Sequence, residues 1–285
     1  MSDDLTESGT PSESAKESEF AKDVDPANIE PSPSPADAFL QSYPGKLVVL
    51  EGTDGVGRST QAELLKHWLE VEGYGVAVSE WKSSMLISNA IDKAKSKNAL
   101  NTITFSLLYA TDLADRLNRE IIPALKAGFI VIADRYFHTA FARDVVRGAD
   151  PNWVRKIYGF APQPDMVFYL KMPIDDLLKR IISTRGRLDF HESGRDIGMS
   201  TDLYQSFKLY QSKIIHEYER MVDEYNFKVI DAAANPHHVQ KILRANLRLL
   251  LGESQASTHP PVAVRLTNPL LDNPLMDFTP NSHSI

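Results

Sequence analysis

The chain has 285 residues, of which 42% are hydrophobic and 24% charged, a composition that is ordinary for a globular protein. It contains no cysteine, which excludes disulfides, thiolate catalysis and cysteine metal sites. The net charge of −7 comes from the start of the chain, because residues 1–40 hold ten Asp or Glu and two Lys, a balance of −8. The remaining residues therefore have a net charge of +1. They show no basic stripe, so we expect no nucleic-acid partner.

The two ends of the chain differ in composition from its middle. Residues 1–42 are rich in Ser, Glu, Asp and Pro, and residues 253–285 contain five prolines and little periodicity. Such segments bury too little apolar surface to offset the entropy of ordering. We therefore expect an acidic, Pro/Ser-rich disordered tail at 1–42, one domain at 43–252 and a Pro-rich disordered tail at 253–285. A signal-peptide pattern and a membrane-length apolar run are both lacking, so we expect a cytoplasmic protein without a membrane partner.

Between these ends, short apolar runs alternate with helical patterns. The runs are continuous rather than alternating, as in strands that are covered on both faces. They lie at residues 46–51, 75–80, 129–133, 166–171 and 227–231. Helices are predicted at about 59–73, 103–126, 137–147, 174–184, 200–225 and 235–251. This alternation predicts an α/β fold with a five-stranded parallel sheet flanked by helices in three layers, and ligands of such sheets bind at the carboxyl ends of the strands.

The first strand leads into a P-loop pattern. The loop reads Gly52, Thr53, Asp54, Gly55, Val56, Gly57, Arg58, Ser59, Thr60. Its glycines let backbone N–H groups face inward, and the following helix adds its positive N-terminal end, so the loop is predicted to hold the phosphates of ATP. The Ser59 hydroxyl is placed to ligate Mg²⁺.

Arg58 stands where the pattern has lysine. Arginine keeps the charge and grips phosphate as a fork, but it is larger and planar, so the exchange is not neutral. Two interpretations stay open: Arg58 clamps the transferring phosphate, or it leaves a pocket that binds nucleotide and turns over slowly.

Three further segments follow in order. They are residues 107–112 (LLYATD), the Asp134-Arg135-Tyr136 motif after the third strand, and residues 164–170 (PDMVFYL). Together with residues 51–61 (EGTDGVGRSTQ), they resemble the thymidylate kinase family, a group of P-loop nucleoside-monophosphate kinases, over about residues 46–250. The resemblance implies the P-loop kinase fold and ATP-dependent phosphoryl transfer, with Mg²⁺, to a nucleoside monophosphate, foremost dTMP to dTDP. It also implies a homodimer.

The resemblance assigns roles to individual residues. Asp54 would contact the acceptor nucleotide, and Tyr109 would stack on its base. Asp134 would organise the Mg²⁺ region with Ser59, and Arg135 would bridge the donor and acceptor phosphates. Tyr136 and Thr139 would line the acceptor pocket. Phosphoryl transfer depends on positive charge around the transferring group, which agrees with Arg135 just past a strand end.

A cationic, glycine-punctuated segment at residues 179–196 is expected to form a lid. In the thymidylate kinase family the catalytic arginine comes from the P-loop or from the lid, and Gly55 follows Asp54 here. We therefore expect Arg185, with Arg187 as second choice, to act with Arg58 and Arg135 in catalysis.

The chain departs from the family pattern on the acceptor side. Leu113 stands where an arginine usually reads the base, and Arg116, one turn further on, is a candidate substitute. Ala140 and Arg143 replace residues near the sugar. Two alternatives therefore remain: a catalytically weak nucleotide-binding or regulatory module, and a deoxynucleoside kinase that would use Glu51 or Glu80 as a base.

Overall fold

The computed structural model describes residues 42–96 and 101–252. The tails expected at 1–42 and 253–285 lie, apart from residue 42, outside the described residues. Five strands form one parallel sheet in the order β2-β3-β1-β4-β5. Their bounds are β1 Lys46–Gly52, β2 Val76–Glu80, β3 Ile130–Asp134, β4 Met166–Lys171 and β5 Lys228–Asp231. The predicted five-stranded parallel sheet is confirmed.

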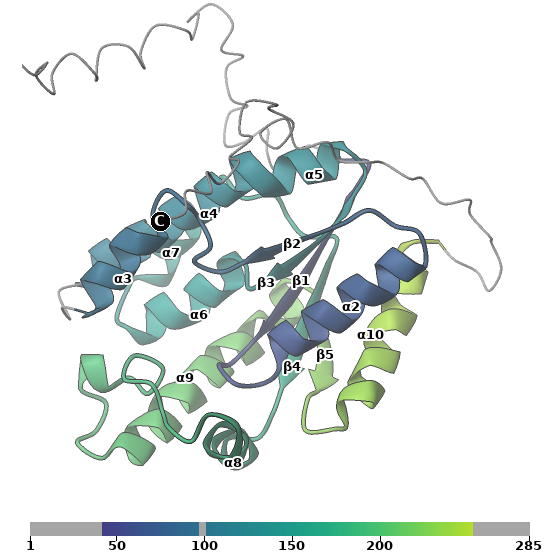
Figure 1. The fold of residues 1–285 in the computed structure, drawn as a ribbon. Helices are drawn as coiled ribbons and strands as arrows, with labels where there is room; N and C mark the ends of the chain where they lie inside the picture. The colour runs from purple at the N-terminus through teal and green to yellow at the C-terminus, as the bar shows by residue number, and fades with distance from the viewer. Residues whose placement is uncertain (1–41, 97–100, 253–285) are drawn as a thin grey trace, which may run out of the picture. The chain divides into compact units, whose positions relative to one another are not determined.

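Helices cover both faces of the sheet (Figure 1). On one face lie α2 (Arg58–Val71) and α10 (Pro236–Leu250). On the other lie α4 (Thr102–Arg116), α5 (Ile122–Lys126), α6 (Phe137–Val146) and α9 (Leu203–Glu224), with α7 (Pro151–Ile157) against α6. The helix α8 (Ile174–Arg185) follows β4 at the carboxyl end of the strands. Within 42–96 and 101–252, every helix is too short or too polar to cross a membrane.

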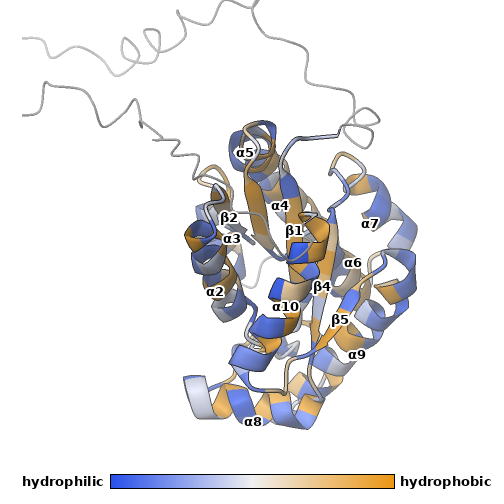
Figure 2. Ribbon diagram, turned by 90° about the vertical axis from the view of Figure 1, so that its right-hand side faces the viewer, coloured by the Kyte–Doolittle hydropathy of each residue, from blue (hydrophilic) through white to orange (hydrophobic). Residues whose placement is uncertain are grey.

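The strands bury alternate residues in two different cores. On β1, Leu47 and Val49 face the layer of α4, α6 and α9, whereas Val48 and Leu50 face the layer of α2 and α10. Figure 2 shows the result: the strands are largely hydrophobic, and hydrophilic residues colour the outer helices. Both faces of the sheet are buried, which is why the strand sequences are continuously apolar rather than alternating.

The helix predicted over 103–126 is interrupted. After α4 the chain forms one π-helical turn, η3 (Leu117–Ile121), before α5. Pro123 lacks an N–H group, and its ring would clash with the carbonyl group four residues earlier in a regular helix, so a wider turn relieves the conflict. The structure also contains α3 (Ser88–Ser96), α7 and the short 3₁₀ turn η4 (Arg195–Ile197), which the sequence patterns did not predict.

Asp165 fixes the amino end of the sheet. One carboxylate oxygen accepts a hydrogen bond of 2.8 Å from the backbone N–H of Leu47, and the other pairs with Lys46 Nζ at 3.0 Å. The Pro164-Asp165 pair therefore ties β4 to β1 at the end of the sheet opposite the P-loop. Its role is structural.

Candidate active site

Two cavities open at the carboxyl ends of the strands. The larger cavity, of about 430 Å³, lies between the P-loop, α8 and the segment after β5. The smaller cavity, of about 290 Å³, lies between the P-loop, the end of β3 and the segment after β2. Arg58 and Ser59 line both cavities. Ligands in the two cavities would therefore meet at these side chains.

The P-loop owes its shape to its glycines. Gly52 has a φ of 142°, and a Cβ atom there would lie 2.5 Å from the carbonyl oxygen of Leu170 on β4. Gly55 has a φ of 83°, and a Cβ atom there would lie 2.4 Å from Ile181 on α8. Side chains at these positions would push the loop away from β4 and α8. Residues 55–60 line the larger cavity, beside the N-terminus of α2, and Asp54 lines the smaller one.

Arg58 curls back over its own loop. Its Nε donates a hydrogen bond of 2.8 Å to Asp134 Oδ1, and its Nη1 donates to the carbonyl oxygens of Gly52, at 2.7 Å, and Thr53. Its Nη2 lies 4.0 Å from Asp54. Burial alone would lower the pKa of this guanidinium, but Asp134 and Asp54 raise it, so Arg58 stays charged. The sequence pattern places Arg58 in the cradle but does not reveal these internal partners.

Ser59 and Asp134, the predicted metal ligands, lie together. The Ser59 hydroxyl donates a hydrogen bond of 2.6 Å to Asp134 Oδ2, and both residues line the smaller cavity. Within 42–96 and 101–252, no cluster of three or more His, Asp or Glu residues forms a metal cage. Mg²⁺ usually takes only one or two protein oxygens and completes its shell with water and phosphate. A hydroxyl and a carboxylate beside a phosphate cradle therefore fit Mg²⁺.

Arg135 is held in an unusual backbone conformation. Its φ is 75°, a region that non-glycine residues rarely adopt and that is enriched at functional sites. Its Nη2 donates a hydrogen bond to Asp54 Oδ1, and its Nη1 donates to the Thr139 hydroxyl at 3.1 Å. Burial alone would raise the pKa of the Asp54 carboxyl, but Arg135, then Arg143 and Arg58, hold it well below its usual range. Asp54 is therefore a carboxylate surrounded by arginines.

Tyr136 and Thr139 lie behind Arg135 rather than at the cavity surface. The Tyr136 ring is fully buried in the core, and its hydroxyl donates to the carbonyl oxygen of Pro162 at 3.1 Å. The Thr139 hydroxyl lies 2.7 Å from Glu51 Oε2, and the Tyr136 N–H donates to Glu51 Oε1 at 2.9 Å. Glu51 is itself fully buried. These contacts orient Arg135, and they leave Glu51 no access to a ligand.

Tyr109 lines the smaller cavity, as predicted, but a second aromatic residue covers it. The rings of Trp81 and Tyr109 stack with centroids 5.4 Å apart and an angle of 13° between their planes. Tyr109 is only 2% exposed, and Trp81 lines the cavity beside it. Trp81 was not singled out as a ligand-binding residue by the sequence analysis. The described structure thus brings an aromatic pair, rather than one ring, to the cavity.

Arg116 does not reach the cavity that it was expected to serve. It is fully buried, with Nε 3.0 Å from Asp112 Oδ2 and Nη1 2.9 Å from the Ser79 hydroxyl. The same Asp112 accepts hydrogen bonds of 3.0 Å from the backbone N–H groups of Lys82 and Ser84. The expectation that Arg116 replaces the base-reading arginine is therefore corrected: the Arg116–Asp112 pair fixes the loop after β2.

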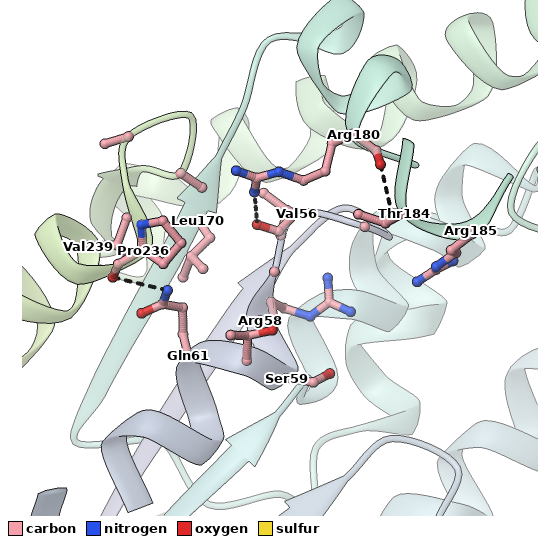
Figure 3. Close-up of a pocket in the computed structure, with 15 residues that line it drawn as sticks. Val56, Arg58, Ser59, Gln61, Leu170, Arg180, Thr184, Arg185, Pro236 and Val239 are labelled. Atoms are coloured by element: carbon pink, nitrogen blue, oxygen red, sulfur yellow. Dashed lines mark hydrogen bonds between the residues drawn. The ribbon is translucent and has the colours of Figure 1, made fainter. Parts of the chain in front are cut away.

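The predicted lid contributes side chains to the larger cavity. Arg185, at the end of α8, lines that cavity and pairs with Glu192 at 2.8 Å. Arg180 Nη1 donates a hydrogen bond of 3.0 Å to the carbonyl oxygen of Val56 and so joins α8 to the P-loop. Figure 3 shows this hydrogen bond between Arg180 and Val56, with the side chains of Arg58 and Arg185 in the lining of the same cavity. Arg187, the second choice, is exposed.

Sequence reasoning missed part of each cavity wall. The larger cavity is also lined by Thr184, Ala232, Ala234, Pro236 and Val239. The smaller cavity is also lined by Lys82, Lys95, Asp189 and Glu192, and by Glu80 and Arg143, which the sequence analysis had named. The segment after the fifth strand could have been found from the rule that ligands bind at the carboxyl ends of strands. Lys95 gives no such signal, because the helix that carries it was not predicted.

The chain is similar to proteins whose names agree with one another. The family model described as "Thymidylate kinase" matches residues 50–242. A "Probable thymidylate kinase 2" of Saccharolobus solfataricus is 43% identical over 210 residues, which cover 73% of this chain and 96% of that protein. A "Probable thymidylate kinase" of Thermococcus kodakarensis is 32% identical over 216 residues, 72% of this chain and 98% of that protein. A "Probable thymidylate kinase" of Pyrococcus horikoshii is 31% identical over 198 residues, which cover 67% of this chain and 90% of that protein.

Proposed function

The chain belongs to the thymidylate kinase family, and we propose that it transfers the γ-phosphoryl group of ATP to dTMP, which yields ADP and dTDP. One observation carries the proposal: Arg58 and Ser59 line both cavities at the end of β1. ATP in the larger cavity would place its γ-phosphate at this junction, and the acceptor phosphate would approach from the smaller cavity. Such alignment is the main requirement for phosphoryl transfer.

Positive charge is supplied from three different elements. Arg58 comes from the P-loop, Arg135 from the end of β3 and Arg185 from the end of α8. We assign them to the phosphoryl group in transit, because charge spread over its equatorial oxygens is best stabilised by fixed cations. Asp54 and Thr139 hold Arg135 in place before substrate binds. Arg58 would exchange its contacts with the Gly52 and Thr53 carbonyl groups for phosphate oxygens.

The loop from Gly52 to Thr60 would bind the ATP phosphates through backbone N–H groups. Ser59 and Asp134 would hold Mg²⁺, whose chemistry at this point is to neutralise phosphate charge. Asp134 would remain the partner of both Ser59 and Arg58 in the free enzyme.

The acceptor would lie in the smaller cavity. Asp54 and the Tyr109–Trp81 pair border the space for its sugar and base, and Tyr136 and Thr139 act from behind Arg135. A deoxynucleoside kinase would need a base near a sugar hydroxyl. Of the two candidates for that base, Glu51 is fully buried under Tyr136 and Thr139, whereas Glu80 lines the smaller cavity. Membership of the thymidylate kinase family therefore decides for a monophosphate acceptor.

We further propose that residues 43–252 suffice for activity, because the similar proteins are covered almost completely by about three quarters of this chain. A cytoplasmic location and a homodimer remain predictions from the sequence.

The reaction is tested by incubating the full chain with ATP, Mg²⁺ and dTMP and identifying the product by ³¹P NMR. A dTDP signal that needs all three components supports the proposal, and ADP with free phosphate as the only products would refute it.

A further inference from the structure

The smaller cavity holds more positive charge than the proposed mechanism uses. Five cationic side chains line it: Arg58, Lys82, Lys95, Arg135 and Arg143. Three of them already contact carboxylates. Arg58 pairs with Asp134 at 2.8 Å, Lys82 with Asp92 at 2.6 Å, and Arg135 with Asp54. The charges of these three are therefore largely compensated within the protein.

Arg143 is different. It lies on α6, one turn after Thr139, and it is only 6% exposed. In the described part of the chain, no carboxylate oxygen lies within 4 Å of its guanidinium, and its buried Nε makes no hydrogen bond. Burial alone would lower its pKa, but Asp54 and Tyr210 raise it, so the group stays cationic. A buried cation without a carboxylate in contact is costly unless a ligand supplies the negative charge.

Lys95 lies near Arg143 and is similarly placed. It lines the same cavity from α3, is partly buried, and has no carboxylate oxygen within 4 Å among the described residues. Arg143 also acts on Asp54, the carboxylate that Arg135 grips. The cavity is lined by as many acidic as basic side chains, but Arg143 and Lys95 are the cations without a contacting carboxylate among the described residues, and Arg143 is close enough to Asp54 of the P-loop to act on it. An acceptor phosphate would have to lie at this end of the cavity.

We propose that Arg143 binds the 5′-phosphate of the acceptor and thereby selects a nucleoside monophosphate over the parent nucleoside. This inference rests on the proposed function and deepens it. A guanidinium can donate two parallel hydrogen bonds to a phosphate, and these charge-assisted bonds are stronger than bonds between neutral groups. The parent nucleoside has no phosphate and cannot form them. Lys95 adds a second cation beside the same phosphate.

The chain offers a matched control at the C-terminal cap of the same helix. Arg147 follows Arg143 by one turn and its side chain is also buried, but it pairs with Asp196 at 2.7 Å and bonds to the Tyr210 hydroxyl at 3.1 Å. It is outside both cavity linings. Arg147→Gln therefore removes a buried guanidinium from the C-terminal end of α6 without removing the proposed phosphate ligand.

The test measures the affinities of dTMP and of thymidine by titration calorimetry, with full-length wild type, Arg143→Gln, Arg143→Lys and Arg147→Gln. Arg143→Gln should weaken dTMP binding about 10- to 100-fold, the usual effect of losing hydrogen bonds to a charged group, and change thymidine binding less than about twofold. Arg143→Lys should restore part of the dTMP affinity. Arg147→Gln should leave the ratio of the two affinities unchanged.

Two results would overturn the inference while the proposed function stands. In one, wild type converts dTMP to dTDP but Arg143→Gln weakens dTMP and thymidine equally, which indicates a structural or sugar-binding role. In the other, Arg143→Gln binds both ligands as wild type does. A wild type that neither binds nor converts dTMP would instead refute the proposed function and the inference with it. Binding of an ATP analogue by each variant reports that the P-loop is intact.

Discussion

The Arg58 guanidinium and the Asp134 carboxylate form a buried ion pair, with Nε 2.8 Å from Oδ1. This pair connects the P-loop to the end of β3, and the second oxygen of the carboxylate accepts the Ser59 hydroxyl at 2.6 Å. One carboxylate therefore positions both the cation and the hydroxyl that line the two cavities.

Arg58→Lys should keep or raise the turnover of ATP with dTMP, and Arg58→Ala should lower it by about 10²- to 10³-fold. A lysine keeps the positive charge. It would also lose the guanidinium's two hydrogen bonds to the Gly52 and Thr53 carbonyl groups, so less would have to be broken before the cation contacts phosphate. The measurement is kcat in a coupled ADP assay. Arg119→Ala, on an exposed side chain that pairs with Asp115, serves as control and should not change kcat. An Arg58→Ala enzyme with the wild-type rate would show that Arg58 has no catalytic role.

Asp134→Asn should raise the Mg²⁺ concentration needed for half-maximal turnover and lower the melting temperature. The amide keeps the shape but removes the charge that balances buried Arg58, and breaking a buried pair in this way costs about 3–5 kcal/mol. Asp165→Asn is the matched control, because it weakens hydrogen bonds at the opposite end of the sheet. That variant should lower stability with the Mg²⁺ requirement unchanged. The same Mg²⁺ dependence in both variants would contradict the metal assignment.

The affinity for dTMP should fall as the pH rises from 7 to 9. Burial, then Arg143 and Lys82, lower the pKa of Lys95 to about 8, while Asp189 and Asp54 oppose the shift. Lys95 is therefore mostly cationic at pH 7 and mostly neutral at pH 9. The acceptor phosphate has its second pKa near 6 and stays dianionic across this range. Calorimetry at fixed ionic strength should show a several-fold weakening for wild type and a flat profile for Lys95→Met; parallel profiles would contradict the role of Lys95.

Much of the fold was predictable because it depends on local patterns. The continuous apolar runs identified all five strands to within one residue at each end, and the glycine pattern identified the P-loop. The interruption near Pro123 was not predicted, since whether proline bends a helix or ends it depends on what packs against that turn. The helix α3 was not predicted either. Of its residues only Ile91 belongs to a buried core cluster, so its sequence gives little apolar periodicity.

The site was less predictable where the outcome depends on partners that are distant in sequence. Arg116 has the spacing of a ligand-binding residue, but Asp112 and Ser79 hold it inside the core. Tyr136 directly follows Arg135, yet its hydroxyl donates a hydrogen bond to the carbonyl oxygen of Pro162 and does not line the cavity. Arg143 was noted as a departure from the family pattern, and only the lack of a contacting carboxylate in the described structure suggests what it does. Spacing gives the face on which a side chain lies, whereas its partner is decided by tertiary packing.

The most direct test is ATP turnover by the purified full-length chain with Mg²⁺ across a panel of acceptors: dTMP, dUMP, dCMP, dGMP, dAMP and thymidine. The account predicts saturable turnover with dTMP, a much lower kcat/KM for the other monophosphates, and none with thymidine. Turnover with thymidine but not with dTMP, or ATP binding without turnover of any acceptor, would contradict it.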